Sequence, residues 1–125
     1  MRRSASSWAG ALPVGKPLAF SGSSLDDLRA FHEAARRAAG RQLWRVQHGV
    51  EPLDWKPIAA VGSGAIEIRI HGGTEHRVFV VTKFVNAIHV MHAFEKTSQG
   101  TPRRDIEIAR RRYQALLEAR RGGSD

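Results

Sequence analysis

Three runs of strand-forming residues joined by short connections constrain the fold of this chain more than any other feature. Each run is rich in β-branched and aromatic residues; the runs are AIEIRIH at 65–71, HRVFVVTKF at 76–84 and NAIHVMHAF at 86–94. The connections between them are short enough for antiparallel hairpins. The sequence therefore predicts an antiparallel meander.

Alternation along the first two strands assigns their faces. The first strand carries isoleucine on one face, at positions 66, 68 and 70, and this face is expected to meet the core. Arg69 lies on the other face, and Arg77 and Lys83 share one face of the second strand. We expect Arg69 and Arg77 to point to the same side, in either a solvated surface or a concave anion site. The third strand shows no clear polar face and stays unassigned.

Helices are predicted before and after the meander. In the segment 21–49, Ser24 is the expected N-cap, and Gly40 leaves two alternatives open, two antiparallel helices or one kinked helix. A last helix is expected from Thr101 as N-cap, with Pro102 at its first position. Its apolar stripe consists of Ile106, Ala109, Tyr113, Leu116 and Leu117.

The remaining segments complete a single α+β domain over residues 16–121. Residues 1–15 are rich in Ser, Ala and Gly without a sustained period, which is typical of a mobile tail. KPLAF at 16–20 is expected to be a short edge strand. Two prolines and two glycines indicate a loop over 51–64.

The charge balance indicates a polyanionic partner. Twenty Lys and Arg face twelve Asp and Glu, a formal net charge of +8. Such a chain favours nucleic acid, an anionic membrane surface or an acidic protein. The last helix carries five arginines that lie mostly away from its apolar stripe, namely Arg103, Arg104, Arg110, Arg111 and Arg112. They form either a solvated face or a contact with a polyanion.

Several classes of site are not expected. The chain has no cysteine, so a disulfide framework and a thiolate metal site are excluded. His89 and His92 are three residues apart on an expected strand and should point to opposite faces, so we predict no metal site and no cofactor. No run approaches the roughly 18 apolar residues of a membrane span, and the N-terminus lacks a continuous signal core, so a cytoplasmic protein without a membrane partner is expected.

Short motifs from 55 to 113 occur together in a specific order. They are Trp55-Lys56-Pro57, Gly62-x-Gly64, Glu67-Ile68-Arg69, His76-Arg77-Val78, His92-Ala93-Phe94, Lys96-Thr97 and Thr101-Pro102 leading to Ala109-x-x-x-Tyr113. This segment resembles the phage-derived, HigB-like branch of the RelE/ParE toxin superfamily, and the resemblance extends over about 16–118. It implies a RelE-like α+β fold, with N-terminal helices packed on a twisted antiparallel sheet and a C-terminal helix.

The resemblance also implies an activity, that of a type II toxin that cleaves mRNA, often at the ribosome, without a metal ion. Arg69 and Arg77 match the phosphate-binding arginines, and Lys96 matches the cation at the end of the last strand. Glu95 stands where related chains have a lysine, and it is either a general base beside Lys96 or a change that lowers charge. Further candidates for RNA contact are Lys56, Lys83, Arg103, Arg104, Arg111 and, although it also fits the core, Tyr113.

The expected protein partner is a helix-turn-helix antitoxin, which would cover the basic residues with acidic side chains in a toxin–antitoxin hetero-oligomer. Two other functions stay open. A ParE-like toxin would inhibit DNA gyrase by binding it, without catalysis, because one fold can carry both functions. The other possibility is an inactive prophage relic that is basic and binds nucleic acid.

Overall fold

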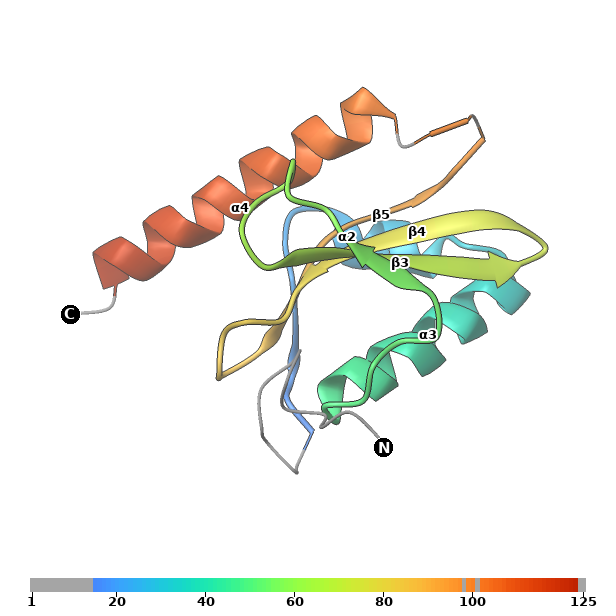
Figure 1. Ribbon diagram of the computed structural model, residues 1–125, viewed down its shortest axis with the longest axis horizontal. Coiled ribbons are helices and arrows are strands. Elements are labelled where there is room, and N and C mark those ends of the chain that lie inside the picture. Colours follow the sequence, from blue (N-terminus) through green and yellow to red (C-terminus); the bar gives the residue numbers. More distant parts are fainter. Residues whose placement is uncertain (1–14, 98, 101, 124–125) are drawn as a thin grey trace.

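The computed structural model describes residues 15–97, 99–100 and 102–123 (Figure 1). Along the chain the elements are β1 (Leu18–Phe20), α2 (Ser24–Arg29), α3 (Glu33–Gln47), β2 (Trp55–Pro57), β3 (Ala65–Gly72), β4 (Thr74–Val81), β5 (Ile88–Glu95) and α4 (Arg103–Gly123). The α+β class is confirmed. Of the expected N-terminal tail, residues 1–14 lie outside the described residues.

The strands form one five-stranded sheet in the order β1-β5-β4-β3-β2. The antiparallel meander of β3, β4 and β5 is confirmed. The sheet as a whole is mixed, because β1 pairs in parallel with β5. The prediction of a loop over 51–64 was wrong at β2, which pairs antiparallel with β3. Pro57 is tolerated there because β2 is an edge strand, where a missing N–H breaks no inner hydrogen bond.

Helices cover both faces of the sheet (Figure 1). On the first face, α2 and α3 bury residues such as Leu43 and Val46 against Ile68 and Val80. On the second, which we call the α4 face, Ala109 and Tyr113 of α4 pack on Phe79, Val81 and Met91. The isoleucines of β3 lie in the first core, as their alternation predicts.

A bulge in β5 changes which side chains share a face. Phe79 of β4 lies opposite His92, whereas the next residue of β4, Val80, lies opposite Val90, so Met91 is an extra residue. The alternation of side chains between the two faces therefore shifts by one residue within β5. This shift explains why the sequence of β5 shows no clear polar face. His89 and His92 lie opposite Val81 and Phe79, two apart on β4, and thus share the α4 face. The expectation that they point to opposite faces was wrong.

The N-terminal helical segment divides at Ala30–His32 and not at Gly40, which lies inside α3. The ring of His32 caps α3 by accepting a hydrogen bond from the Ala35 N–H at 3.5 Å. Ser24 is not the N-cap of α2 but its first residue, and its buried hydroxyl donates to the Val90 carbonyl at 3.1 Å. This tertiary acceptor on β5 is invisible in the local sequence.

The apolar stripe of α4 is confirmed, and one glycine lets it reach the sheet. α4 begins directly after Pro102, whereas the expected N-cap, Thr101, lies outside the described residues. The Tyr113 ring lies against Gly62, where an added Cβ would be 1.7 Å from the ring carbon Cδ2. The Tyr113 hydroxyl donates to the Ser63 carbonyl. The turn before β3 is thus tied to α4.

We expect Gly62→Ala to destabilise the protein by about 3 kcal/mol, because Tyr113 must leave its position to admit the methyl group. Urea unfolding measures the change. Gly40→Ala is the matched control, since an added Cβ there meets no atom within 4 Å. Because Gly40 lies inside α3, Gly40→Ala should stabilise the protein by roughly 0.5–1 kcal/mol. Equal effects of the two substitutions would contradict the packing of Tyr113 on Gly62.

Candidate functional site

A row of functional side chains crosses the α4 face beside α4. Arg69 of β3 lies opposite Arg77 of β4, which lies opposite Phe94 of β5. The expectation that the two arginines share one side is confirmed. In the neighbouring row, Lys56 of β2 lies opposite Glu67 of β3. The sheet therefore gathers Lys56, Arg69 and Arg77 from three strands.

Arg77 is buried and held by carboxylates. Its side chain is 9% exposed, and its Nε donates to Glu67 Oε2 at 3.0 Å. Its Nη1 donates to Glu75 Oε1 at 2.9 Å and to the His76 carbonyl at 3.1 Å. Glu67 is 1% exposed, and its Oε1 lies 3.9 Å from Lys56 Nζ. A buried charge needs such partners, and the alternating pattern alone did not reveal them for Arg77.

Arg69 is held much less firmly than Arg77. Its side chain is one third exposed, and its Nη1 lies 3.5 Å from Asp54 Oδ1. Its Nε is buried and makes no hydrogen bond within the part of the chain that the structure describes. Arg69 therefore keeps hydrogen-bonding capacity at the surface of the sheet.

A histidine links the two carboxylates at this end of the sheet. His71 Nε2 lies 2.6 Å from Asp54 Oδ2, and its Nδ1 lies 2.8 Å from Glu75 Oε2. The hydrogen bonds to Glu75 and Asp54 raise the pKa of His71. The hydrogen bonds from His71 and Arg77 lower the pKa of Glu75. We call these seven residues the charge cluster; they are Asp54, Lys56, Glu67, Arg69, His71, Glu75 and Arg77.

Glu95 is the last residue of β5, and Lys96 follows it. The backbone N–H of Lys96 donates to the Glu75 carbonyl at 2.8 Å, which brings Lys96 to the end of the sheet that carries the charge cluster. Glu95 lies opposite His76, on the other face of the sheet from Arg77, and lines the pocket described below. Glu95 is therefore directed away from the face that carries Arg77.

The remaining predicted RNA contacts are scattered. Lys83 lies beyond the end of β4 that is remote from the β3–β4 hairpin, with its Nζ 5.7 Å from the Tyr113 ring centre. Tyr113 is only 3% exposed and belongs to the core. The three arginines of α4 among these predicted contacts are exposed, namely Arg103, Arg104 and Arg111.

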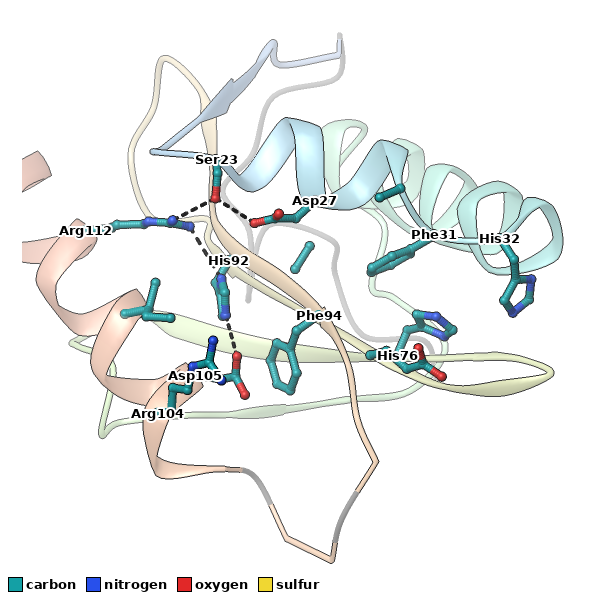
Figure 2. Close-up of a pocket in the computed structure, with 14 residues that line it drawn as sticks. Ser23, Asp27, Phe31, His32, His76, His92, Phe94, Arg104, Asp105 and Arg112 are labelled. Carbon is teal, nitrogen blue, oxygen red and sulfur yellow. Dashed lines mark hydrogen bonds and ion pairs between the residues drawn. The ribbon is translucent and has the colours of Figure 1, made fainter.

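A pocket lies at the edge of β5, between α2 and α4 (Figure 2). β1 pairs with β5 only as far as Val90, whereas β5 continues to Glu95. Among the described residues, the second half of β5 therefore has no neighbouring strand on this side. The pocket has a volume of about 660 Å³ and receives side chains from α2, β4, β5 and α4.

Two side chains of α4 join this pocket to the sheet (Figure 2). Asp105 Oδ1 lies 2.7 Å from His92 Nε2, and Arg112 Nη1 lies 3.4 Å from His92 Nδ1. Arg112 also donates to the Met91 carbonyl at 3.0 Å and to the Ser23 hydroxyl at 3.0 Å. Both ring nitrogens of His92 are thus engaged, which makes it a structural link rather than a free base. Sequence reasoning missed this link because Asp105 and His92 lie in different elements.

Two kinds of feature are absent from the described ranges. Within 15–97, 99–100 and 102–123, no group of three or more His, Asp or Glu side chains could hold a metal ion. Over the same ranges, no helix is long and apolar enough to cross a membrane.

Comparison with known protein families places most of the chain in one of them. A family model described as phage derived protein Gp49-like (DUF891) matches residues 26–114, which is 89 of the 125 residues. The matched segment contains the whole charge cluster and the first part of α4, including Asp105 and Arg112. No curated protein matches the chain.

We expect Glu67→Gln to destabilise the protein by roughly 3 kcal/mol, because it removes the negative charge beside buried Arg77. Glu118→Gln is the control, since Glu118 pairs with Arg121 at 3.0 Å with both side chains largely exposed. Such a surface pair contributes about 0–1 kcal/mol. Urea unfolding at pH 7 compares the two variants. A small effect of Glu67→Gln would show that Arg77 does not depend on this carboxylate.

The His71 ring should titrate above its ordinary pKa of 6.5, because Glu75 and Asp54 stabilise its charged form. A raised pKa in the folded state means that this contribution to stability is complete below the unfolded pKa and is lost as pH rises through the folded pKa. NMR titration of the His71 ring measures the midpoint. Glu75→Gln should move the midpoint down, whereas Glu118→Gln should leave it unchanged. A midpoint at or below 6.5 in the unaltered protein would contradict the bridge between the two carboxylates.

Proposed function

Because the chain belongs to the phage-derived Gp49-like family, we propose that it is the toxin of a type II toxin–antitoxin system and cleaves RNA without a metal ion. One observation carries the proposal: Arg69 lies on the α4 face beside buried Arg77, with its side chain one third exposed and its Nη1 3.5 Å from Asp54 Oδ1. A HigB-like, ribosome-directed mRNA interferase is the finer assignment that we favour.

The reaction requires charge stabilisation and two proton transfers. The ribose 2′-hydroxyl attacks the adjacent phosphorus, a pentacoordinate phosphorane forms, and the 5′-oxygen leaves with a proton. An arginine suits the phosphorane because its planar fork binds two oxygens and keeps its charge. Arg69 is the residue for this contact, since its bond to Asp54 is long at 3.5 Å.

The other members of the charge cluster have supporting roles. Arg77 is committed to Glu67 and Glu75, so it positions the site from beneath instead of binding the phosphate itself. Lys56 and Lys96 supply positive charge around Arg69. Asp54, which is 39% exposed and lies beside Arg69, is the proton acceptor for the 2′-hydroxyl. The His71 ring, whose pKa is raised by its hydrogen bonds to Glu75 and Asp54, is the proton donor for the 5′-oxygen.

A toxin of this kind needs an inhibitor that covers its basic residues. We propose a helix-turn-helix antitoxin whose bound segment places acidic side chains on Arg69 and Lys56. The charge of the chain, +8, favours such a segment as well as RNA.

A second candidate function, inhibition of DNA gyrase by binding, is favoured by the internal neutralisation of the charge cluster. Lys56, Arg69 and Arg77 are matched by three carboxylates, Asp54, Glu67 and Glu75. A cluster that compensates its own charge binds polyanions less strongly, which also suits an inactive relic. Loss of gyrase supercoiling at stoichiometric protein, with RNA intact, would identify the inhibitor.

We expect the purified protein to cut a short mRNA, alone or with ribosomes, and Arg69→Ala to lower the rate about 100-fold or more. Arg69→Lys should recover only part of the rate, because a lysine keeps the positive charge but lacks the planar fork that binds two phosphate oxygens in a fixed geometry. Gel analysis of end-labelled RNA measures the cleavage. Arg77→Ala is a poorer test, since it removes a donor from buried Glu67 and so lowers stability.

Arg37→Ala is the matched control for Arg69→Ala. Arg37 lies exposed on α3, paired with Glu33 at 2.8 Å, on the side of the sheet away from α4. The Arg37→Ala variant should cut RNA at the same rate as the unaltered protein. No cleavage by the unaltered protein, with or without ribosomes, would contradict the proposed function. An unchanged rate in Arg69→Ala would instead remove Arg69 from the site.

A further inference from the structure

The pocket at the β5 edge adjoins the proposed cleavage site through one side chain. Phe94 lies opposite Arg77 in the sheet and also lines the pocket. From this arrangement we infer that the pocket binds one base of single-stranded RNA, next to the nucleotide whose phosphate meets Arg69, and that it prefers a base with an amino group. This inference rests on the proposed function, because it takes RNA as the ligand.

Aromatic rings line the pocket on two sides (Figure 2). The His92 and Phe94 rings stack with centroids 5.2 Å apart and an angle of 23° between their planes. On the other side, the Phe31 and His76 rings lie with centroids 4.4 Å apart. Of these four residues His92, Phe31 and His76 are buried, so half-buried Phe94 is the ring that a base can reach. Proteins that bind single-stranded RNA hold unstacked bases on rings of this kind. The volume of about 660 Å³ admits a planar base together with solvent.

The charges of the lining select which part of a nucleotide enters. The carboxylates Asp27, Glu95 and Asp105 outnumber the guanidinium groups of Arg104 and Arg112. This excess disfavours a phosphate inside the pocket, which therefore stays outside with Arg69. A carboxylate accepts hydrogen bonds from the amino groups of adenine and cytosine, whereas uracil offers an acceptor at the equivalent position.

Glu95 is the carboxylate to make this distinction. Asp105 already accepts from His92 at 2.7 Å, and Asp27 already accepts from the Ser23 hydroxyl at 2.7 Å. Glu95 is exposed at the end of β5, on the rim of the pocket. Its carboxylate can therefore meet the amino group of an incoming base without breaking either of these bonds.

Binding can be measured apart from cleavage with 2′-O-methyl hexanucleotides, because a methylated 2′-oxygen cannot attack the phosphate. Fluorescence anisotropy with A6, C6 and U6 gives the three affinities at a fixed, low salt concentration. We expect A6 and C6 to bind several-fold more tightly than U6. Glu95→Gln should bring the three affinities together, since the amide presents both a donor and an acceptor.

Phe94→Leu tests the stacking surface, because leucine keeps an apolar side chain but has no ring. It should weaken binding of all three oligonucleotides about tenfold. Phe20→Leu is the matched control: Phe20 is also a half-buried phenylalanine of a strand, on β1, but does not line the pocket. It should bind as the unaltered protein does, and circular dichroism confirms that both variants are folded.

Equal affinities for A6, C6 and U6 in the unaltered protein, full binding by Phe94→Leu, or no binding at all would each overturn the inference. Full binding by Phe94→Leu would instead favour a peptide strand, paired with the open edge of β5, as the ligand of this region. Failure of the proposed function has a different signature, since unmodified RNA would then stay intact whatever the affinities of the methylated oligonucleotides. Selective A6 and C6 binding by a protein that cuts unmodified RNA supports both.

Discussion

The extra residue in β5 is the constraint on which the rest of the structure depends. With Ile88 and Val90 directed to the first core, an unbroken alternation would send His92 and Phe94 to that core as well. The bulge at Met91 reverses this, so that both rings lie on the α4 face. Phe94 then stands beside Arg77, and His92 can meet Asp105 of α4. One backbone irregularity thus supplies both the last residue of the arginine row and the attachment of the helix.

Burial separates the two arginines that the sheet places side by side. Arg77 is surrounded, and its charge is held by Glu67 and Glu75 within 3.0 Å. Such a residue is rigid, because moving it would take the guanidinium away from the Glu67 carboxylate, which is 1% exposed and lies in a region of low dielectric. Arg69 is one third exposed and only loosely held by Asp54. In the proposed reaction, the buried arginine supplies the framework and the exposed one meets the phosphate.

The pocket and the charge cluster complement each other chemically. The cluster offers the partly exposed guanidinium of Arg69 on an open face, which suits a phosphate of RNA, whereas the pocket offers ring faces and carboxylates, which suit a base. Phe94 belongs to both regions. Glu95, which stands where the sequence resemblance led us to expect a lysine, lies on the pocket side, where the inferred role of its carboxylate is to distinguish bases at a distance from Arg69.

Local periodicity by itself determined the meander, the apolar stripe of α4 and the common face of Arg69 and Arg77. These features repeat every two or every 3.6 residues, so that neighbours along the chain suffice to predict them. Only the tertiary structure decided the parallel pairing of β1, the existence of β2, the bulge at Met91 and the break before α3. It also decided that Arg77 is held by Glu67 and Glu75 and that Tyr113 rests on Gly62. The pairing of β1 and β2, the contact of Arg77 with Glu67 and the packing of Tyr113 on Gly62 each depend on a partner from another segment of the chain, and a hydrogen bond or close contact of that kind leaves no period in the sequence.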